Sequence, residues 1–532
     1  MIDILHIIQC LADGGAPRAV AAVGKQSSLT GRFCHRVLSI LPPTAGGRQL
    51  AHDAGMEIVS PGPDKSVRQY IDDADIVQMH FWNSPELYRF LGALFPPMRL
   101  IVWFHVAGDH PPQIIRPEIV AFADLALACS PYQFSIAPFR DLPEEMRAAK
   151  TDLVIAPPEP ARLKNITPRA HEGFNVGYIG TVDPVKMHPD FLDMSAGVRI
   201  PEACFIVCGG GQGEVELRKM ATSRGIADRF EFRGFVEDIV SVIEVLDVFG
   251  YPLCAGNYSA ADLVLQEVML AGVPPVIFAH GGTQVLVQDG ETGLIVRDAP
   301  AYQRAIEELH ASPEKRKRLG RNARRYAQQH FGAEIAARRL NGIYERIMQQ
   351  PKHRRGRLMG GGEDRLQPVA AKGARTFVYA LGHTAAAFGV SLYGTSVAEL
   401  IDAERIIANS GPLLRGSGSG GVFQYRNAYP DDPYLRLWTG LILRAQGFNV
   451  RAYIEFRKAI ELGFDHWRVH GYLAQSARSI GATKVAQEAA EVIRGRAPAY
   501  LEVFGEDGGR DGAKLDSHWR SGAAPSATGD LG

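Results

Sequence analysis

The feature that most constrains the fold of this chain is a regular alternation of short apolar runs and amphipathic segments over residues 1–350. Short apolar runs bounded by turn residues are typical of strands buried on both faces, and segments with helical spacing, such as Arg18–Ser28, are typical of helices that cover them. The runs are Ile4–Ile8, Val37–Leu41, Ile76–Met79, Leu100–Phe104, Leu125–Cys129, Leu153–Ala156, Asn175–Ile179, Cys204–Cys208, Arg229–Phe232, Val248–Tyr251, Val276–Phe278 and Gly293–Val296. The pattern predicts an α/β protein with parallel sheets.

A proline-rich segment, Pro157–Pro168 (PPEPARLKNITP), interrupts this rhythm, which restarts at Phe174. Such a segment is typical of a linker. A chain of 532 residues also exceeds a single domain, since about 150 residues per domain is usual. We therefore expect two doubly wound, Rossmann-like domains, at residues 1–165 and 166–350.

The remaining chain has a different character. Residues 351–375 are basic and then glycine-rich, which predicts a flexible linker. Residues 376–504 show helical patterning, and residues 505–532 have the composition of a disordered tail.

The helical region contains a weak internal repeat. Gly447 and Gly481, and likewise Ala452 and Ala486, lie 34 residues apart. This spacing resembles a tetratricopeptide (TPR-like) helix pair followed by a degraded second one, although Phe464 stands where that family favours proline. A generic helical bundle remains the alternative, because two repeats are few for a solenoid.

The composition argues against several classes of protein. Lys plus Arg and Asp plus Glu each total 58, so the net charge is zero, which argues against a general polyanion binder. The six cysteines are too few for a disulfide scaffold and form no zinc pattern, so we interpret them as reduced thiols of a cytosolic protein.

Two segments bear on membranes. Met1–Gln9 carries Asp3 and His6 and has no export-signal pattern, so it is interpreted as a first strand. Thr376–Leu400 has Glu399 as its only charge and is long enough to span a bilayer, but its Gly, Ser and Thr residues favour a packed helical hairpin over a membrane helix.

Glycines follow several predicted strands, at the strand ends where α/β proteins bind ligands. These segments are Gly14–Gly15, Gly180–Lys186, Gly209–Gly213 and Asp262–Gly272 with the following His280–Val296. Glycine between a strand and a helix lets the backbone approach an anion. The ammonium of Lys186 could neutralise a diphosphate leaving group, and the carboxylate of Glu267 could accept hydrogen bonds from ribose hydroxyls. Each feature alone also fits an ordinary turn or loop.

Taken in this order, these segments resemble the retaining glycosyltransferases of the GT-B fold, family 4, over residues 1–350. Gly180-x5-Lys186 resembles the family's donor-phosphate loop, and Glu267-x3-Ala271-Gly272-x-Pro274 its nucleotide-sugar helix. Further matches are Gly14-Gly15-Ala16, His105 after the strand LIVWF, Asp228–Gly234 beside the base, Gly281-Gly282 with Asp289-Gly290-x-Thr292-Gly293 as a closing loop, and Ala333–Gln349 as a last helix that crosses back.

Three positions depart from the family pattern. Thr181 stands where an arginine is usual, Ser259 replaces the first glutamate of Glu-x7-Glu, and Val285 replaces the glutamate after the Gly-Gly pair. Loss of a charge-assisted contact costs about 1.5–3 kcal/mol. The departures therefore put turnover in doubt more than the fold.

The resemblance implies a GT-B enzyme, followed by an α-helical TPR-like domain, that moves a hexose from a nucleoside diphosphate sugar to a glycan or lipid-linked acceptor. It also implies a role in cell-surface polysaccharide synthesis, without a metal or other cofactor. The implied catalytic residues are His105, Lys186 and Glu267. The implied donor-binding residues are Gly15, Gly180, Thr181, Phe235, Ser259, Val264, Leu265 and Gly282.

Two alternatives stay open. The chain could be a catalytically weakened, nucleotide-sugar-binding scaffold that recruits a partner through its helical domain, or a GT-B epimerase that acts on the donor alone. For each we expect a cytoplasmic protein, with peripheral contact to the inner face of the membrane through His353–Arg357 as a further option. No nucleic-acid partner is expected.

Two other patterns have ordinary explanations. Asp73-Ala74-Asp75 is an Asp-x-Asp sequence, which can hold a metal, but it directly precedes a predicted strand and is interpreted as a turn. His80 follows a strand and could face the ligand site or serve as a core histidine.

Overall fold

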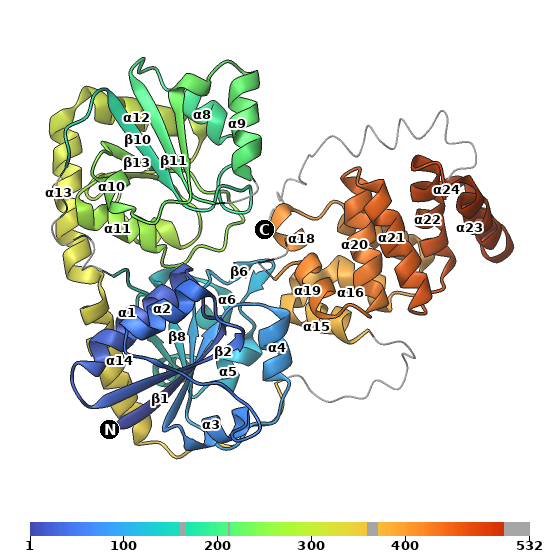
Figure 1. The fold of residues 1–532 in the computed structure, drawn as a ribbon, viewed down its shortest axis with the longest axis horizontal. Coiled ribbons are helices and arrows are strands. Elements are labelled where there is room, and N and C mark those ends of the chain that lie inside the picture. Colours follow the sequence, from blue (N-terminus) through green and yellow to red (C-terminus); the bar gives the residue numbers. More distant parts are fainter. Residues whose placement is uncertain are drawn as a thin grey trace, which may run out of the picture. The chain divides into compact units, whose positions relative to one another are not determined.

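The structure is a computed structural model that describes residues 1–159, 163, 166, 168–210, 213–358, 371–416, 418 and 420–504 (Figure 1). The described residues fall into two compact units, divided between residues 361 and 362. The expected disordered tail at 505–532 and residues 359–370 of the expected linker lie outside the described residues.

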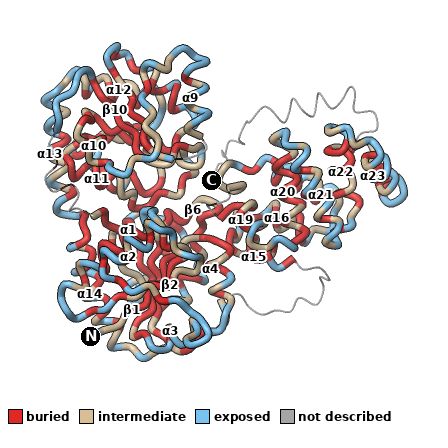
Figure 2. Tube along the Cα trace, in the orientation of Figure 1, coloured by how far each residue is buried: buried red, intermediate tan, exposed pale blue. Residues whose placement is uncertain are grey.

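The first sheet of the N-terminal unit has seven strands, all parallel, and they alternate in sequence with helices. Their order across the sheet is β3 (Glu57–Ile58), β2 (Phe33–Leu41), β1 (Ile2–Cys10), β4 (Ile76–Phe81), β5 (Leu100–Phe104), β8 (Leu125–Ala128) and β9 (Thr151–Leu153). β4, β5 and β8 are buried along their whole length, which is why they read as continuous apolar runs (Figure 2).

Helices surround this sheet. They are α1 (Gly15–Ser28), α2 (Ala45–Asp53), α3 (Val67–Asp73), α4 (Pro85–Leu91), α5 (Pro117–Phe122), α6 (Ala137–Arg140) and α7 (Glu144–Lys150). A short hairpin of β6 (Asp109–His110) and β7 (Gln113–Ile114) follows β5.

The second sheet has six parallel strands in the order β12 (Phe230–Gly234), β11 (Ala203–Cys208), β10 (Phe174–Ile179), β13 (Val248–Tyr251), β14 (Pro275–Phe278) and β15 (Leu294–Val296). Its helices are α8 (Phe191–Ala196), α9 (Gly213–Ser223), α10 (Val240–Ile243), α11 (Leu263–Ala271), α12 (Ala299–Ala311) and α13 (Pro313–His330). The prediction of two parallel α/β sheets is therefore confirmed. The bounds of one strand differ from the prediction: the apolar run Leu153–Ala156 was expected as a strand, but β9 ends at Leu153.

The helix α14 (Ala333–Met348) follows the second sheet in sequence but packs on the first sheet beside α1 (Figure 1). The Tyr344 hydroxyl donates to Gln78 Oε1 of β4 at 2.6 Å, and the Ser27 hydroxyl donates to Asn341 at 2.6 Å. The sequence around α14 therefore links the two sheets into one unit.

Residues 351–358 continue along the first sheet, although the sequence predicted the start of a flexible linker here. The backbones of His353 and Met98 exchange two hydrogen bonds of 3.1 Å. Arg355 is 8% exposed and pairs with Asp124. Two ordered backbone bonds and a shielded ion pair hold this basic segment in place.

The C-terminal unit is helical, and its described residues contain no strand. Its helices are α15 (Lys372–Leu381), α16 (Ala386–Tyr393), α17 (Val397–Ala408), α18 (Pro412–Arg415), α19 (Val422–Ala428), α20 (Pro433–Ala445), α21 (Asn449–Glu461), α22 (Trp467–Ser479), α23 (Thr483–Arg496) and α24 (Leu501–Phe504). Residues 376–400 are divided among α15, α16 and α17. Among the helices described, none has the length and apolar character needed to cross a bilayer.

The helices α20 to α23 form two successive pairs, and each helix packs against the next. Gly447 and Gly481, which occupy matching positions after α20 and α22, have left-handed φ values of 81° and 77°. A Cβ atom on Gly440 would lie 2.5 Å from the Phe456 ring, so α20 and α21 pack closely there. The tetratricopeptide-like nature of these pairs stays a prediction.

Candidate active site

Glycines at the carboxyl ends of β10 and β11 let two loops meet. A Cβ atom on Gly209 would lie 1.7 Å from the carbonyl oxygen of Gly180, and Gly209 has a φ of 143°. The Gly180 amide donates to the Cys208 carbonyl at 2.9 Å. Only glycine allows this approach, and it places the loop with Thr181 and Lys186 at the edge of the sheet where ligands are expected.

Lys186 extends from this loop toward the start of α11. Its Nζ atom lies 3.2 Å from Asp262 Oδ2 and 5.5 Å from the centre of the Tyr251 ring, and its side chain is 14% exposed. Burial alone would lower the pKa of Lys186, but the neighbouring charges, chiefly that of Asp262, outweigh it and the pKa is raised. The ammonium is therefore present at neutral pH.

Asp262 is a residue of this site to which the sequence analysis assigned no role. Its side chain is 2% exposed, and the Tyr251 hydroxyl lies 3.1 Å from both carboxylate oxygens. A carboxylic residue directly before the apolar helix was visible in the sequence. Nothing in the sequence, however, indicated that it would turn toward Lys186.

The first turn of α11 presents backbone amides beside this ion pair. The first backbone bond of the helix runs from the Gln266 amide to the Asp262 carbonyl, so the amides of residues 263–265, including Val264 and Leu265, precede it. No side chain caps the helix. Glu267 lies farther along α11 and is 7% exposed.

The Gly281-Gly282 pair closes the site from the side of β14. A Cβ atom on Gly282 would lie 2.0 Å from the Ala260 carbonyl oxygen. The Gly282 amide donates to the carbonyl of buried Ser259 at 2.8 Å. This amide is therefore engaged within the protein, and Gly282 acts in packing.

The other predicted donor-binding residues are placed differently. The N-terminal unit has a first lobe, built on the seven-stranded sheet, and a second lobe, built on the six-stranded sheet. A Cβ atom on Gly15, in the first lobe, would lie 3.6 Å from Leu263 at the start of α11, so this glycine is brought to the site. Phe235 is 67% exposed, and Val285, which is one of the three departures from the family pattern, is 37% exposed. Neither of these two side chains is packed into the site.

His105 is the end of a row of hydrogen-bonded histidines. Nδ1 of His35 lies 2.8 Å from Nε2 of His6, Nδ1 of His6 lies 3.0 Å from Nε2 of His80, and Nδ1 of His80 lies 2.9 Å from Nε2 of His105. The row crosses β2, β1, β4 and the end of β5, which are neighbours in the sheet. His80, which the sequence left open, thus connects His105 to the core.

Burial lowers the pKa of every member of this row, to about 4 for His35 and about 3 for His105. The rings are therefore neutral. Because a neutral imidazole donates one hydrogen bond and accepts one, all protons in the row must point the same way. The tautomer of His105 is consequently coupled to those of the other three.

The two lobes of this unit are in contact beside the site. The Ala107 amide, two residues after His105, donates to the Tyr258 carbonyl at 2.9 Å. Gln266 of α11 donates to the Ala156 carbonyl at 2.9 Å. Ala260 and Ala261 belong to the apolar core of the first lobe.

The two carboxylates of the Asp-x-Asp sequence serve other partners. Asp75 accepts from the amide of Asp3 in β1 at 2.9 Å, and Asp73 pairs with Lys65 at 2.5 Å. Within the described ranges, no group of three or more acidic, histidine or cysteine residues could hold a metal ion. Asp73 is the last residue of α3, and Asp75 lies in the connection between α3 and β4.

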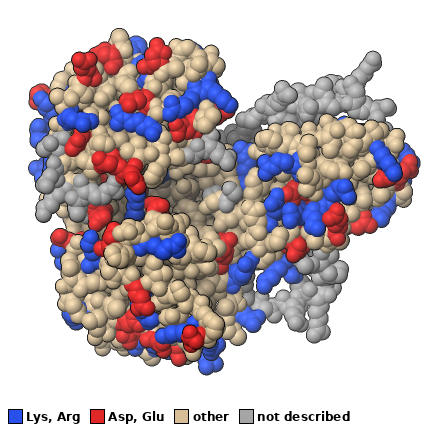
Figure 3. All heavy atoms as spheres, in the orientation of Figure 1, with Lys and Arg blue, Asp and Glu red and all other residues tan. Residues whose placement is uncertain are grey.

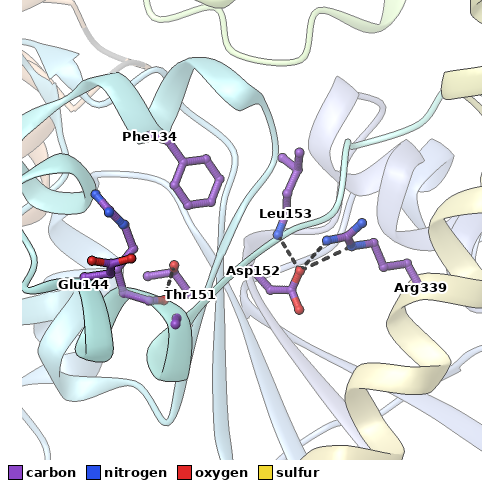
Figure 4. A pocket seen from close by; sticks show the side chains of 8 residues that line it. Phe134, Glu144, Thr151, Asp152, Leu153 and Arg339 are labelled. Carbon is purple, nitrogen blue, oxygen red and sulfur yellow. Dashed lines mark hydrogen bonds and ion pairs between the residues drawn. The ribbon is translucent and has the colours of Figure 1, made fainter.

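A cavity of about 380 Å³ lies elsewhere, between α7, β9 and α14 (Figure 4). None of the predicted site residues lines it. Asp152, which lines this cavity, forms ion pairs with Arg339 at 2.7 Å and with Arg346 at 2.8 Å. The negative charge of its carboxylate is therefore already neutralised. On the face drawn in Figure 3, both signs of charge are interspersed over the surface.

The second lobe is the part of the chain that matches a known protein family in sequence. Residues 161–326 match the family model of the glycosyl transferases group 1. An alpha-D-kanosaminyltransferase of Streptomyces kanamyceticus is 28% identical over 176 residues, which cover 32% of this chain and 45% of the relative. A D-inositol 3-phosphate glycosyltransferase of Streptomyces coelicolor is 31% identical over 193 residues, covering 33% and 41%. The chain thus spans less than half the length of these two relatives.

Solved structures extend the likeness to both lobes. HepE of Anabaena in complex with UDP aligns with a TM-score of 0.53 at 19% identity and covers 65% of this chain and 100% of its own. Sucrose-phosphate synthase of Thermosynechococcus elongatus aligns with a TM-score of 0.51 at 17% identity, covering 66% and 100%. The family match is thus confined to residues 161–326, and the likeness to solved structures shows a GT-B-like fold.

Proposed function

We propose that the chain is a retaining glycosyltransferase that moves a hexose from a nucleoside diphosphate sugar to a glycan or lipid-linked acceptor. One observation carries the proposal: Lys186 and the first-turn amides of α11 lie together at the strand ends of the lobe that matches the family. Since the solved structure of HepE contains UDP, UDP is the first nucleotide to test. Because the matches cover only part of the relatives, donor and acceptor are parts of the proposal.

In the transfer, the bond between the anomeric carbon and the diphosphate oxygen breaks, a bond to the acceptor oxygen forms on the same face of the sugar, and the proton of the acceptor hydroxyl passes to the departing diphosphate. Negative charge develops on the departing diphosphate, where Lys186 and the amides of residues 263–265 would stabilise it. Glu267 would bind the ribose. His105 would orient the sugar from the first lobe.

Ser259, Thr181 and Val285 indicate a weakened or altered donor site, as in the scaffold alternative. The named relatives are transferases, however, and this favours turnover. Donor consumption without an acceptor would instead favour the epimerase. We further propose a cytoplasmic site of action in surface polysaccharide synthesis, with a protein partner for the helical unit.

The test is titration calorimetry with UDP, ADP and GDP, followed by release of the nucleotide from sugar donors in the presence of acceptors. We expect Lys186→Ala to weaken binding of the nucleotide by about tenfold or more and to lower turnover. Lys317→Ala, on α13, is a matched control that should change neither. Unaltered nucleotide binding by Lys186→Ala would refute the role of this lysine.

A further inference from the structure

The proposed donor site contains a built-in anion. Asp262 has 2% of its side chain exposed, and its carboxylate lies 3.2 Å from the ammonium of Lys186. The Tyr251 hydroxyl donates to the same carboxylate from the other side, 3.1 Å from each oxygen. The cation assigned to the diphosphate is therefore already paired with a protein carboxylate.

The backbone at Asp262 is held in an unusual conformation. Its φ of 31° and ψ of 86° are left-handed, and among the described residues it alone has a positive φ without being glycine. Such a conformation is unfavourable for an L-residue and persists where surrounding interactions enforce it. Lys186 and Tyr251 provide those interactions.

Asp262 stands directly before helix α11 but does not cap it with its side chain. Aspartate is a preferred residue at the position before a helix, where its carboxylate usually accepts from the first-turn amides. Asp262 occupies this position before α11, but its side chain makes no such bond. The carboxylate is directed to Lys186, and the amides remain for a ligand.

We propose that Asp262 is an internal competitor of the diphosphate for Lys186 and thereby sets how weakly the donor is held. The inference rests on the proposed function, because it takes Lys186 as a phosphate-binding residue. A diphosphate that reaches Lys186 and the α11 amides must approach a shielded carboxylate of the same sign. Like charges at this range repel, and solvent screens a buried carboxylate poorly.

The opposite role for Asp262 would be to hold Lys186 in position for the phosphate. The two roles predict opposite signs. If Asp262 competes, removal of its charge tightens nucleotide binding; if it positions Lys186, removal loosens binding. A role as a ligand for a divalent cation would make binding by the natural chain depend on that cation.

The experiment is calorimetric titration of the full chain with UDP, in EDTA and again with Mg²⁺. Asp262→Asn removes the charge but keeps a residue that tolerates the left-handed region, whereas Asp262→Gly removes both charge and strain. We expect both variants to bind UDP more tightly in EDTA, on the order of tenfold. Tyr251→Phe, which loses one of the two groups that hold Asp262, should change binding in the same direction but less.

Two controls define the result. Asp190→Asn removes a carboxylate of the same lobe that is 67% exposed, and it should leave UDP binding unchanged. The double variant Lys186→Ala with Asp262→Asn should bind UDP no more tightly than the natural chain does, because the cation released in Asp262→Asn is absent. Thermal unfolding of each variant shows whether the fold is retained.

The outcomes separate the two proposals. If neither the natural chain nor any variant binds UDP, ADP or GDP, the proposed function fails. If the natural chain binds UDP and Asp262→Asn binds it equally or more weakly, the inference is overturned while the proposed function stands. Mg²⁺-dependent binding that is lost with Asp262→Asn would also overturn it.

Discussion

The Nδ1 atom of His80 lies 2.9 Å from Nε2 of His105, so the histidine that the proposal places against the sugar is held by a second histidine from the neighbouring strand. His80 is 1% exposed. It is thus a positioning residue for His105.

We expect His80→Leu to lower kcat by about tenfold, since His105 loses one buried hydrogen bond. His80→Asn can place an amide near the position of Nδ1 and should retain most of the rate. Steady-state kinetics with a sugar donor measure both variants. Equal rates for His80→Leu and the natural chain would show that His105 needs no such support.

The stability of the N-terminal unit should fall as the pH is lowered from about 6.5 to 4. The pKa of buried His35 is lowered to about 4 from 6.5, so the unfolded chain binds a proton in this range that the folded chain does not. His35 alone accounts for a loss of up to about 3 kcal/mol. Urea unfolding at several pH values measures it.

A variant His35→Leu should show a shallower fall in stability over the same pH range, whereas His52→Asn, which replaces a histidine with an 83% exposed side chain, should match the natural chain. The same slope in all three proteins would contradict a buried, neutral His35.

Gly209→Ala should destabilise the second lobe by about 2 kcal/mol or more and weaken UDP binding, because its Cβ would overlap the Gly180 carbonyl oxygen. A Cβ atom on the neighbouring Gly210 would have open space within 4 Å. Gly210→Ala is therefore the matched control for denaturant unfolding and calorimetry, and its properties should stay close to those of the natural chain.

Donor turnover should persist in EDTA. The proposal assigns charge neutralisation to Lys186 and the α11 amides, so a chelator has nothing essential to remove. Release of nucleoside diphosphate, followed with and without EDTA, measures this. Activity that is lost in EDTA and restored by Mg²⁺ would assign part of that role to a cation.

In the helical unit, Gly440→Ala should cost about 1–3 kcal/mol, because the added methyl would lie 2.5 Å from the Phe456 ring. Gly495→Ala, at a helical position with open space around it, should be neutral or stabilising by up to about 1 kcal/mol. Denaturant unfolding compares the two. A neutral Gly440→Ala would mean that α20 and α21 can separate without cost.

The sequence predicted the sheets well because strands buried on both faces leave continuous apolar runs, as in Leu100–Phe104. It missed the two-residue strand β3 and the β6–β7 hairpin, whose residues are too few to form a pattern. For the edge strand β9 the sequence predicted residues 153–156, whereas the strand is Thr151–Leu153. The prediction was shifted because Val154 and Ala156 are buried and apolar although they follow the strand.

The site was predicted only in part. Lys186 and Gly209 follow strands, as the sequence predicted, and their part in ligand binding stays a prediction. The pairing of Lys186 with Asp262 depends on a left-handed backbone at residue 262, and no local pattern indicates this for an aspartate. His6 and His35 were hidden because a single histidine within an apolar strand looks like any other core position. The row of hydrogen-bonded histidines forms only when the four strands that carry or directly precede them lie side by side in the sheet.

Residues 252–262 connect β13 to α11, yet Ala260 and Ala261 within this segment are embedded in the core of the first lobe. Residues that lead directly to Asp262 are thereby fastened to the half of the unit that carries His105. Any separation of the halves must extract Ala260 and Ala261 from apolar surroundings and break the bond between Ala107 and Tyr258. His105 and helix α11 are consequently kept in register by the polypeptide itself.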